Sequence, residues 1–303
     1  MNKPSIKFTQ SQITGLLWGG ILGDCIGRVF EGKNPTERVD TDLDYPFYTT
    51  DDTQLTLATC EAIDKDLTVD PEKIAQRFRY WFEQSKIYGI GASTLRAMRN
   101  LSAGQHWALA GNKGEYASGN GAAMRIAPLA LIVDPFNSSD REVIKDVCRI
   151  THNDDEAYLG ALAILIAIRF NLMDCNYDLE SVLRDVAIEL PDSRVRDRLN
   201  TLNNESAKYS LLECVRKYGN SGYVVESVPF TLFALKLLRE TNYKSAIIDI
   251  VKCGGDADTV ASMYGQIVGA RVGYELLPKD LIKRVEEKDE MERIVEGFLR
   301  RIS

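Results

Sequence analysis

Residues 13–27 read ITGLLWGGILGDCIG, and this stretch decides the fold class. Apolar side chains recur there with the spacing of one helix face, at Ile13, Leu16, Leu17 and Ile21. Glycines recur at every fourth residue beside that face, at Gly15, Gly19, Gly23 and Gly27. Each glycine inside a helix costs roughly 0.5–1 kcal/mol relative to alanine, so a row of them needs a compensating gain. The row predicts either very close packing of a neighbouring helix or space for a ligand beside Asp24.

Helical periodicity continues along most of the chain, whereas the alternation that is typical of strands is scarce. It predicts further helices over 54–64, 71–86, 91–101, 121–132, 140–150, 155–172, 178–190, 206–218, 228–240, 244–252, 259–275 and 279–301. Residues 39–49 are expected to form a loop, and the polar residues 190–206 a surface excursion. The sequence therefore predicts an all-α protein, with a single compact domain of orthogonal helices over residues 1–303.

The composition is that of a soluble globular protein, with 45% hydrophobic and 27% charged residues. The net charge of −7 argues against nucleic acid as a primary partner, because a broad basic surface is missing. The longest apolar run, 157–168, is short for a membrane span, so we expect a buried core helix there and no membrane partner. The N-terminal residues lack the apolar centre of a signal peptide, and the six cysteines form no CxxC pair. We expect a monomer in the cytoplasm.

Two acidic clusters lie far apart in the sequence, and each opens onto an apolar run with helical spacing. They are Thr50-Asp51-Asp52-Thr53 and Gly254-Gly255-Asp256-Ala257-Asp258-Thr259. Aspartate and threonine are favoured N-caps, so either cluster alone could simply cap its helix. A cap needs only one such residue, however, and crowded carboxylates repel one another unless a cation neutralises them. If the fold brings the clusters together, their oxygen atoms suit Mg²⁺, Mn²⁺ or Ca²⁺.

Several other residues have both a functional and a structural interpretation. The loop 118–121 reads SGNG and precedes a predicted helix, so it either presents N–H groups to a phosphate or is only a turn. Arg125 lies one turn further on and could neutralise an anion or form a salt bridge. His152 lies between two predicted helices, where a histidine commonly has a capping or structural role, and His106 lies in a loop without an expected role. Glu31, taken alone, is an ordinary exposed carboxylate.

Together these segments resemble the ADP-ribosylglycohydrolase family, which includes dinitrogenase-reductase-activating glycohydrolase and the ADP-ribosyl-acceptor hydrolases. The matching segments follow the family's order over most of the chain: GDCIG (23–27) with Glu31, TDDT (50–53), SGNGAAMR (118–125), Thr151-His152 and GDADT (255–259). The resemblance implies an all-α fold and two divalent cations, Mg²⁺ or Mn²⁺. It also implies hydrolysis of the bond between ADP-ribose and an acceptor.

The resemblance further implies roles for individual residues. The metal ligands would be Thr50, Asp51, Asp52, Asp256, Asp258 and Thr259. The diphosphate would lie on Ser118, Gly119, Asn120 and Gly121, and His152 would contact the ligand. Tyr223 lies where relatives place contacts to the adenosine or ribose, although an aromatic residue there could equally be a packing residue. Asp52 and Glu31 are the candidates for proton transfer, with Asp52 ahead of Glu31. Ala257 departs from many relatives, which carry a polar residue there, but its side chain should point away from the metals.

The acceptor is left open by the sequence. Analogy with compact bacterial-type relatives favours an ADP-ribosylated protein modified on arginine, from which the enzyme would release ADP-ribose. The alternatives are an O-linked acceptor (serine, poly(ADP-ribose) or O-acetyl-ADP-ribose), a catalytically idle relative that binds ADP-ribose, and an unrelated metal-dependent phosphohydrolase.

Overall fold

The structure is a computed structural model that describes residues 8–36, 43–114, 116–239 and 241–302. Helices make up the regular structure in these ranges, so the all-α prediction is confirmed. The α-helices are α1 (Gln10–Gly27), α2 (Asp51–Ala62), α3 (Pro71–Glu83), α4 (Ala92–Ser102), α5 (Trp107–Ala110), α6 (Ser138–Arg149), α7 (Asp155–Met173), α8 (Val182–Glu189), α9 (Arg194–Glu205), α10 (Leu211–Tyr218), α11 (Val224–Ala234), α12 (Tyr243–Val251), α13 (Ala257–Val272), α14 (Lys279–Ile282) and α15 (Lys288–Ile302). Short 3-10 helices are η1 (Arg28–Phe30), η2 (Asn120–Ala122), η3 (Ala127–Leu131), η4 (Ser206–Lys208), η5 (Leu235–Arg239) and η6 (Tyr274–Leu276).

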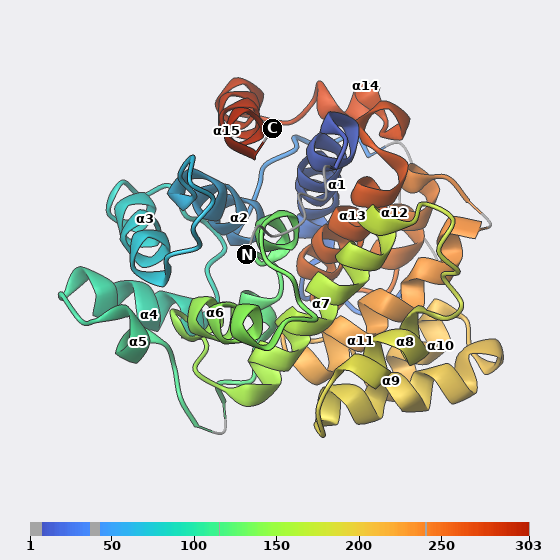
Figure 1. The fold of residues 1–303 in the computed structure, drawn as a ribbon. Coiled ribbons are helices and arrows are strands. Elements are labelled where there is room, and N and C mark those ends of the chain that lie inside the picture. Colours follow the sequence, from blue (N-terminus) through green and yellow to red (C-terminus); the bar gives the residue numbers. More distant parts are fainter. Residues whose placement is uncertain (1–7, 37–42, 115, 240, 303) are drawn as a thin grey trace.

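The glycine row of α1 packs against α13, so helices from opposite ends of the chain lie side by side at the centre of the molecule (Figure 1). A Cβ atom at Gly19 would lie 2.1 Å from the carbonyl oxygen of Gly265, and one at Gly23 would lie 2.0 Å from that of Ala261. Even alanine is therefore too large at these positions. The prediction of very close helix packing is confirmed.

The apolar run around Ala157–Ile168 forms the buried helix α7, as expected. The helix is longer than the run itself. By length and composition, Gln10–Phe30 and Asp155–Met173 could each cross a membrane, but 83% and 78% of their most apolar stretches are buried inside the protein. Buried hydrophobic residues from Leu16 to Phe298 form one cluster. The single domain and the lack of a membrane partner stay predictions.

Two of the expected elements are wrong. Residues 121–132 form the 3-10 helices η2 and η3 and not one α-helix, because Pro128 has no N–H to donate to the carbonyl oxygen of Met124 and would break an α-helix there. Residues 190–206 contain α9, which buries Val195, Leu199 and Leu202 at the spacing of one helix face. The polar composition of this segment concealed three well-placed apolar residues.

Other expected helices have different ends. Residues 279–301 are divided into α14 and α15, and Glu287 has a left-handed φ of +56° between them. Helix α11 begins at residue 224, four residues before the start of the helix expected over 228–240. Residues 235–239 of that expected helix form η5. Part of the expected loop over 39–49 lies outside the described residues, and residues 43–49 contain no helix.

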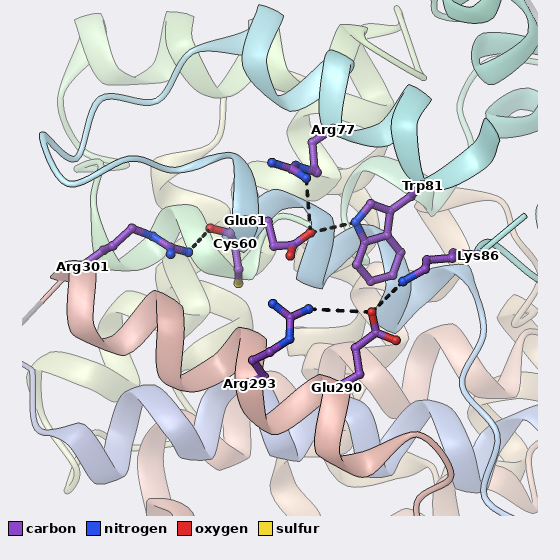
Figure 2. Close-up of polar contacts among 8 residues, drawn as sticks. All are labelled: Cys60, Glu61, Arg77, Trp81, Lys86, Glu290, Arg293 and Arg301. Carbon is purple, nitrogen blue, oxygen red and sulfur yellow. Dashed lines mark hydrogen bonds and ion pairs between the residues drawn. The ribbon is translucent and has the colours of Figure 1, made fainter. Parts of the chain in front are cut away.

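The C-terminal helix α15 holds the C-terminal half of α2 (Figure 2). Arg301 Nη2 donates to the carbonyl oxygen of Cys60 at 2.9 Å, in the last turn of α2. Beside it, the Glu61 carboxylate accepts a 2.8 Å bond from Trp81 Nε1 of α3. The other members of this network are Arg77, Lys86, Glu290 and Arg293. Because the first turn of α2 carries an acidic cluster, this network fixes that helix from the end opposite the cluster.

Candidate metal centre and active site

The two acidic clusters meet where the N-terminal ends of α2 and α13 lie beside α1. Thr259 Oγ1 donates a hydrogen bond to Asp52 Oδ2 at 3.1 Å, which joins the clusters directly. Asp24, Asp52 and Asp258 are buried, and each has a carboxylate oxygen within 4.8 Å of one on each of the other two. The prediction that these distant aspartates converge is confirmed.

A second group of carboxylate oxygens, also within 4.8 Å of one another, lies beside the first. Its members are Glu31, Asp256 and Asp258. The glutamate reaches this position because Gly32 N donates to Gly255 O at 2.7 Å and Gly255 N donates to Lys33 O at 2.9 Å. Gly255 has a φ of +64°, and a Cβ atom there would lie 1.9 Å from the carbonyl oxygen of Asn220. Glycine is therefore required at this turn.

Capping explains only part of the acidic clusters. At the N-terminus of α2, Thr50 is the N-cap and its hydroxyl accepts from Asp52 N at 3.4 Å, while Asp24 of α1 accepts hydrogen bonds from Thr50 N (2.9 Å), Thr50 Oγ1 (2.8 Å) and Thr53 N (3.2 Å). Asp256 occupies the N-cap position of α13, yet its side chain makes no capping bond. The carboxylates of Asp52 and Asp256 thus need another explanation than helix capping.

The carboxylates of the centre are in an environment that disfavours negative charge. Burial, followed by Asp258 and Asp24, raises the pKa of Asp52 well above its usual value. Burial, followed by Asp256 and Asp24, raises the pKa of Asp258 in the same way. Burial and then the neighbouring Asp24 raise the pKa of Asp51. Charged carboxylates at this density are costly unless a cation is bound among them.

The donor set fits a divalent cation. Asp52 Oδ1 is buried and, among the described residues, makes no hydrogen bond, so this oxygen is available to a cation. In the part of the chain that the structure describes, no lysine or arginine forms an ion pair with Asp24, Asp52 or Asp258. Carboxylate and hydroxyl oxygens are the ligands that Mg²⁺ and Mn²⁺ prefer.

A cleft of about 570 Å³ opens onto this centre. Its lining includes eleven of the predicted site residues together with Glu31: Asp51, Asp52, Ser118, Gly119, Asn120, Gly121, His152, Tyr223, Asp256, Asp258 and Thr259. Thr50 is the exception: it is not among the lining residues, and its hydroxyl donates to Asp24 Oδ1 at 2.8 Å. The residues predicted from distant segments are therefore brought to one cleft.

The loop 118–121 is fixed by bonds that limit what it can offer a ligand. Asn120 N donates to Gly222 O at 3.0 Å, so this backbone N–H is already used. The Asn120 side-chain amide donates to Asp256 Oδ2 and, at 3.0 Å, to Ser227 Oγ. Asn120 therefore orients an aspartate of the candidate metal centre, and a diphosphate would have to bind other groups of the loop.

His152 is buried, and its ring packs against the same loop. A Cβ atom at Gly121 would lie 2.6 Å from His152 Cε1, and one at Gly119 would lie 2.9 Å from Nε2. Of the capping and structural roles considered for His152, capping is wrong, because Asp154 caps α7 by accepting a bond from Ala157 N at 3.1 Å. The two glycines thus make room for an imidazole, which the sequence did not reveal.

The remaining candidates lie at or outside the edge of the cleft. The Tyr223 hydroxyl accepts a 3.2 Å bond from Arg194 of α9. His106 lies outside the cleft lining and caps the short helix α5, where its Nδ1 accepts from Ala108 N at 3.2 Å. The salt-bridge interpretation of Arg125 is wrong, since it is fully buried and, within the described residues, has no carboxylate partner; it also lies outside the cleft lining, and its role toward an anion stays a prediction.

Asp24 is the main residue that the sequence interpretation did not place in the site. It is fully buried, and it is the single charged residue within the apolar stretch 13–27. A buried acid in such a stretch is rarely tolerated without partners, so the position itself was the available signal.

Comparison with known proteins identifies the family. A sequence model described as ADP-ribosylglycohydrolase matches residues 6–303. An uncharacterized protein of Archaeoglobus fulgidus is 30% identical over 250 residues, which cover 81% of this chain and 78% of that protein. ADP-ribosylhydrolase ARH3 of Danio rerio is 26% identical over 334 residues, covering 93% of this chain and 89% of the relative.

Two further similarities agree with this result. ADP-ribosylarginine hydrolase Tri1 of Serratia proteamaculans is 25% identical over 319 residues, covering 98% of this chain and 82% of the relative. A solved structure described as an ADP-ribosylglycohydrolase-related protein complex has the same fold, with a TM-score of 0.70 and 24% identity over 97% of this chain and 99% of that chain. The chain belongs to the ADP-ribosylglycohydrolase family, a family of hydrolases that act on ADP-ribose linkages.

Proposed function

We propose that this protein is a metal-dependent hydrolase that removes ADP-ribose from an arginine side chain of a modified protein. The observation that carries the proposal is the buried meeting of Asp24, Asp52 and Asp258, with one oxygen of Asp52 left without a partner. Similarity to a relative named ADP-ribosylarginine hydrolase favours arginine as the acceptor.

Two divalent cations, Mg²⁺ or Mn²⁺, would be held by Thr50, Asp51, Asp52, Asp256, Asp258 and Thr259. When bound, they would hold the ribose diol and polarise a water molecule. Asp24 would stand behind the ligands, since hydrogen bonds from α2 already occupy its oxygens. Its role is to fix the first turn of α2 against α1.

The chain itself would supply the proton-transfer group. Asp52 is surrounded by other carboxylates and hydroxyls, which suits a metal ligand. Glu31 is exposed at the cleft, and partial burial, together with Asp256 and Asp24, raises its pKa. Because Glu31 is exposed at the cleft, it can exchange a proton with water there, whereas Asp52 is buried. We therefore place Glu31 ahead of Asp52 in this role.

An O-linked acceptor is the second candidate. Relatives named ADP-ribosylhydrolase ARH3 match this chain as well as the arginine hydrolase does, and that name specifies no acceptor. A monomeric state, a cytoplasmic location and the lack of nucleic-acid partners are further proposals, based on composition.

The proposal is tested with arginine-, serine- and ester-linked ADP-ribosylated substrates, each incubated with and without a chelator. We expect chelator-sensitive release of intact ADP-ribose from the arginine-linked substrate. Release from the serine- or ester-linked substrate alone would establish the second candidate. Release of AMP would indicate pyrophosphate cleavage and refute both.

A further inference from the structure

Arg125 is fully buried beneath the cleft, and packing does not explain it. Its guanidinium lies over the ring of Phe78, 4.7 Å from the centroid, and Nη2 donates to Val147 O (3.2 Å) and Thr151 Oγ1 (2.8 Å). Its Nε and Nη1 atoms are buried and make no hydrogen bond to any residue that the structure describes. A buried cation without a counter-ion is costly, so an apolar side chain would fill this space at lower cost.

The bond to Thr151 extends to His152. Thr151 is fully buried, and its Oγ1 lies 2.9 Å from His152 Nδ1. A hydroxyl group has one proton to donate and can accept two hydrogen bonds. Because a guanidinium is always a donor, the hydroxyl oxygen of Thr151 accepts from Arg125 and keeps its own proton for another partner.

The partners of Thr151 decide which atom donates in the hydrogen bond between Thr151 Oγ1 and His152 Nδ1. Among the described residues, its hydroxyl makes hydrogen bonds only to Arg125 and His152. If His152 Nδ1 carried a proton and donated it, the threonine proton would be buried without an acceptor, at a cost of about 1–3 kcal/mol. The low-cost arrangement has Thr151 donating to an unprotonated Nδ1, which leaves the imidazole proton on Nε2.

His152 Nε2 faces the loop that lines the cleft. It lies 2.9 Å from the Cβ position of Gly119 and 3.3 Å from that of Gly121, and within the described chain no residue forms a hydrogen bond with it. Burial and the nearby Arg125 lower the pKa of His152 to about 3, so the ring is neutral. A neutral Nε2–H next to this loop is suited to an anionic oxygen, whereas a bare nitrogen there would repel one.

We infer that Arg125 is a positioning residue which, through Thr151, fixes His152 in the tautomer with its proton on Nε2, and that this N–H donates to a phosphate oxygen of the ADP-ribosyl ligand. The identity of the ligand rests on the proposed function. The tautomer does not, because it follows from contacts within the chain.

The tautomer can be measured by two-bond ¹H–¹⁵N correlation spectra of ¹⁵N-labelled protein at about pH 8, where an ordinary imidazole is neutral. The chain has only two histidines, so assignment is simple. We expect an unprotonated Nδ1 and a protonated Nε2 for His152 in the wild type and in the conservative variant Thr151→Ser. Thr151→Val and Arg125→Met should lose this single tautomer, since the hydroxyl or its donor is removed.

His106 serves as the control within each spectrum, because its Nδ1 accepts from a backbone N–H and should not change among the variants. Circular dichroism excludes variants that fail to fold. ADP-ribose binding, measured by calorimetry, should weaken about tenfold in Thr151→Val and be restored in Thr151→Ser. A wild-type proton on Nδ1, or an unchanged tautomer in both disruptive variants, would overturn the inference. The expected tautomer in a wild type that does not bind ADP-ribose would refute the proposed function and leave the positioning role of Arg125 standing.

Discussion

Replacing Asp52 by asparagine should have opposite effects on the metal-free and the metal-loaded protein. In the metal-free protein, Asp52 is a buried carboxylate facing Asp24 and Asp258. Asparagine keeps one oxygen for the bonds from Thr50 and Thr259 and replaces the other, unpartnered oxygen by an amide N–H. That N–H can donate to the neighbouring carboxylates, so the metal-free variant should be the more stable.

The size of this effect follows from the cost of an unsatisfied buried charge. We expect a gain of roughly 1–3 kcal/mol, the usual range for hydrogen bonds to charged groups and for buried groups without a partner. A chain of 303 residues has an unfolding entropy of about 0.6 kcal/mol per kelvin, so Tm should rise by about 2–5 °C. Saturating Mg²⁺ or Mn²⁺ should stabilise the wild type by about 2.7 kcal/mol at a hundred times Kd, or about 4 °C. In Asp52→Asn this metal-dependent rise should be largely lost.

The same carboxylates make the effect depend on pH. Burial and neighbouring carboxylates raise the pKa of Asp52 and Asp258 in the folded state above the unfolded value near 3.8. At pH values between the unfolded and the folded pKa, the folded protein therefore binds more protons than the unfolded chain. The contribution of these carboxyls to the stability of the metal-free fold is therefore fully present below about pH 3.8, and it is lost as the pH rises through the folded pKa. A bound cation would displace these protons, so its stabilising effect should grow as the pH rises through the folded-state pKa values of Asp52 and Asp258.

Differential scanning calorimetry of chelator-treated protein, with and without added Mn²⁺, measures the Tm of the wild type and of Asp52→Asn and the rise in Tm that the metal causes in each. Asp44→Asn is the matched control, because Asp44 is exposed and lies outside the cleft lining. A lower Tm for metal-free Asp52→Asn, together with an equal metal-dependent rise in variant and wild type, would refute the reasoning.

Three further predictions can be tested in parallel. Asp256→Ala should abolish turnover and leave the helical circular dichroism signal unchanged, and normal turnover would remove the metal-centre proposal. Asn120→Asp places a carboxylate against Asp256 Oδ2, so it should raise the Kd for ADP-ribose about tenfold by calorimetry, and an unaltered Kd would mean that the loop is only structural. Gly19→Ala would bring a Cβ atom to 2.1 Å from Gly265 O, so it should reduce the free energy of unfolding, measured in urea, by more than about 2 kcal/mol. The control is Gly297→Ala inside α15, where a Cβ atom has space. This control should raise the free energy of unfolding by roughly 0.5–1 kcal/mol.

Much of this architecture was readable from local patterns. The glycine row of α1 predicted a close helix neighbour, and the two acidic clusters predicted a shared centre. The sequence could not show that Asp24 caps α2 across a helix interface, because that contact depends on how α1 and α2 meet. Arg125 gave no local sign of burial, since arginine is usually exposed and its surroundings come from α3 and α6. Helix α9 was missed because its three buried residues are diluted by polar neighbours.

The pairing of α1 with α13 has a consequence for biosynthesis. The centre draws on both ends of the polypeptide, and the Thr259–Asp52 bond alone joins positions 207 residues apart. During synthesis on the ribosome, the glycine face of α1 stays uncovered until α13, near the end of the chain, has emerged. Native contacts between residues so far apart in the sequence also form slowly. A polypeptide truncated upstream of residue 257 would therefore lack α13, and with it Asp258, Thr259 and the helix that covers the glycine face of α1.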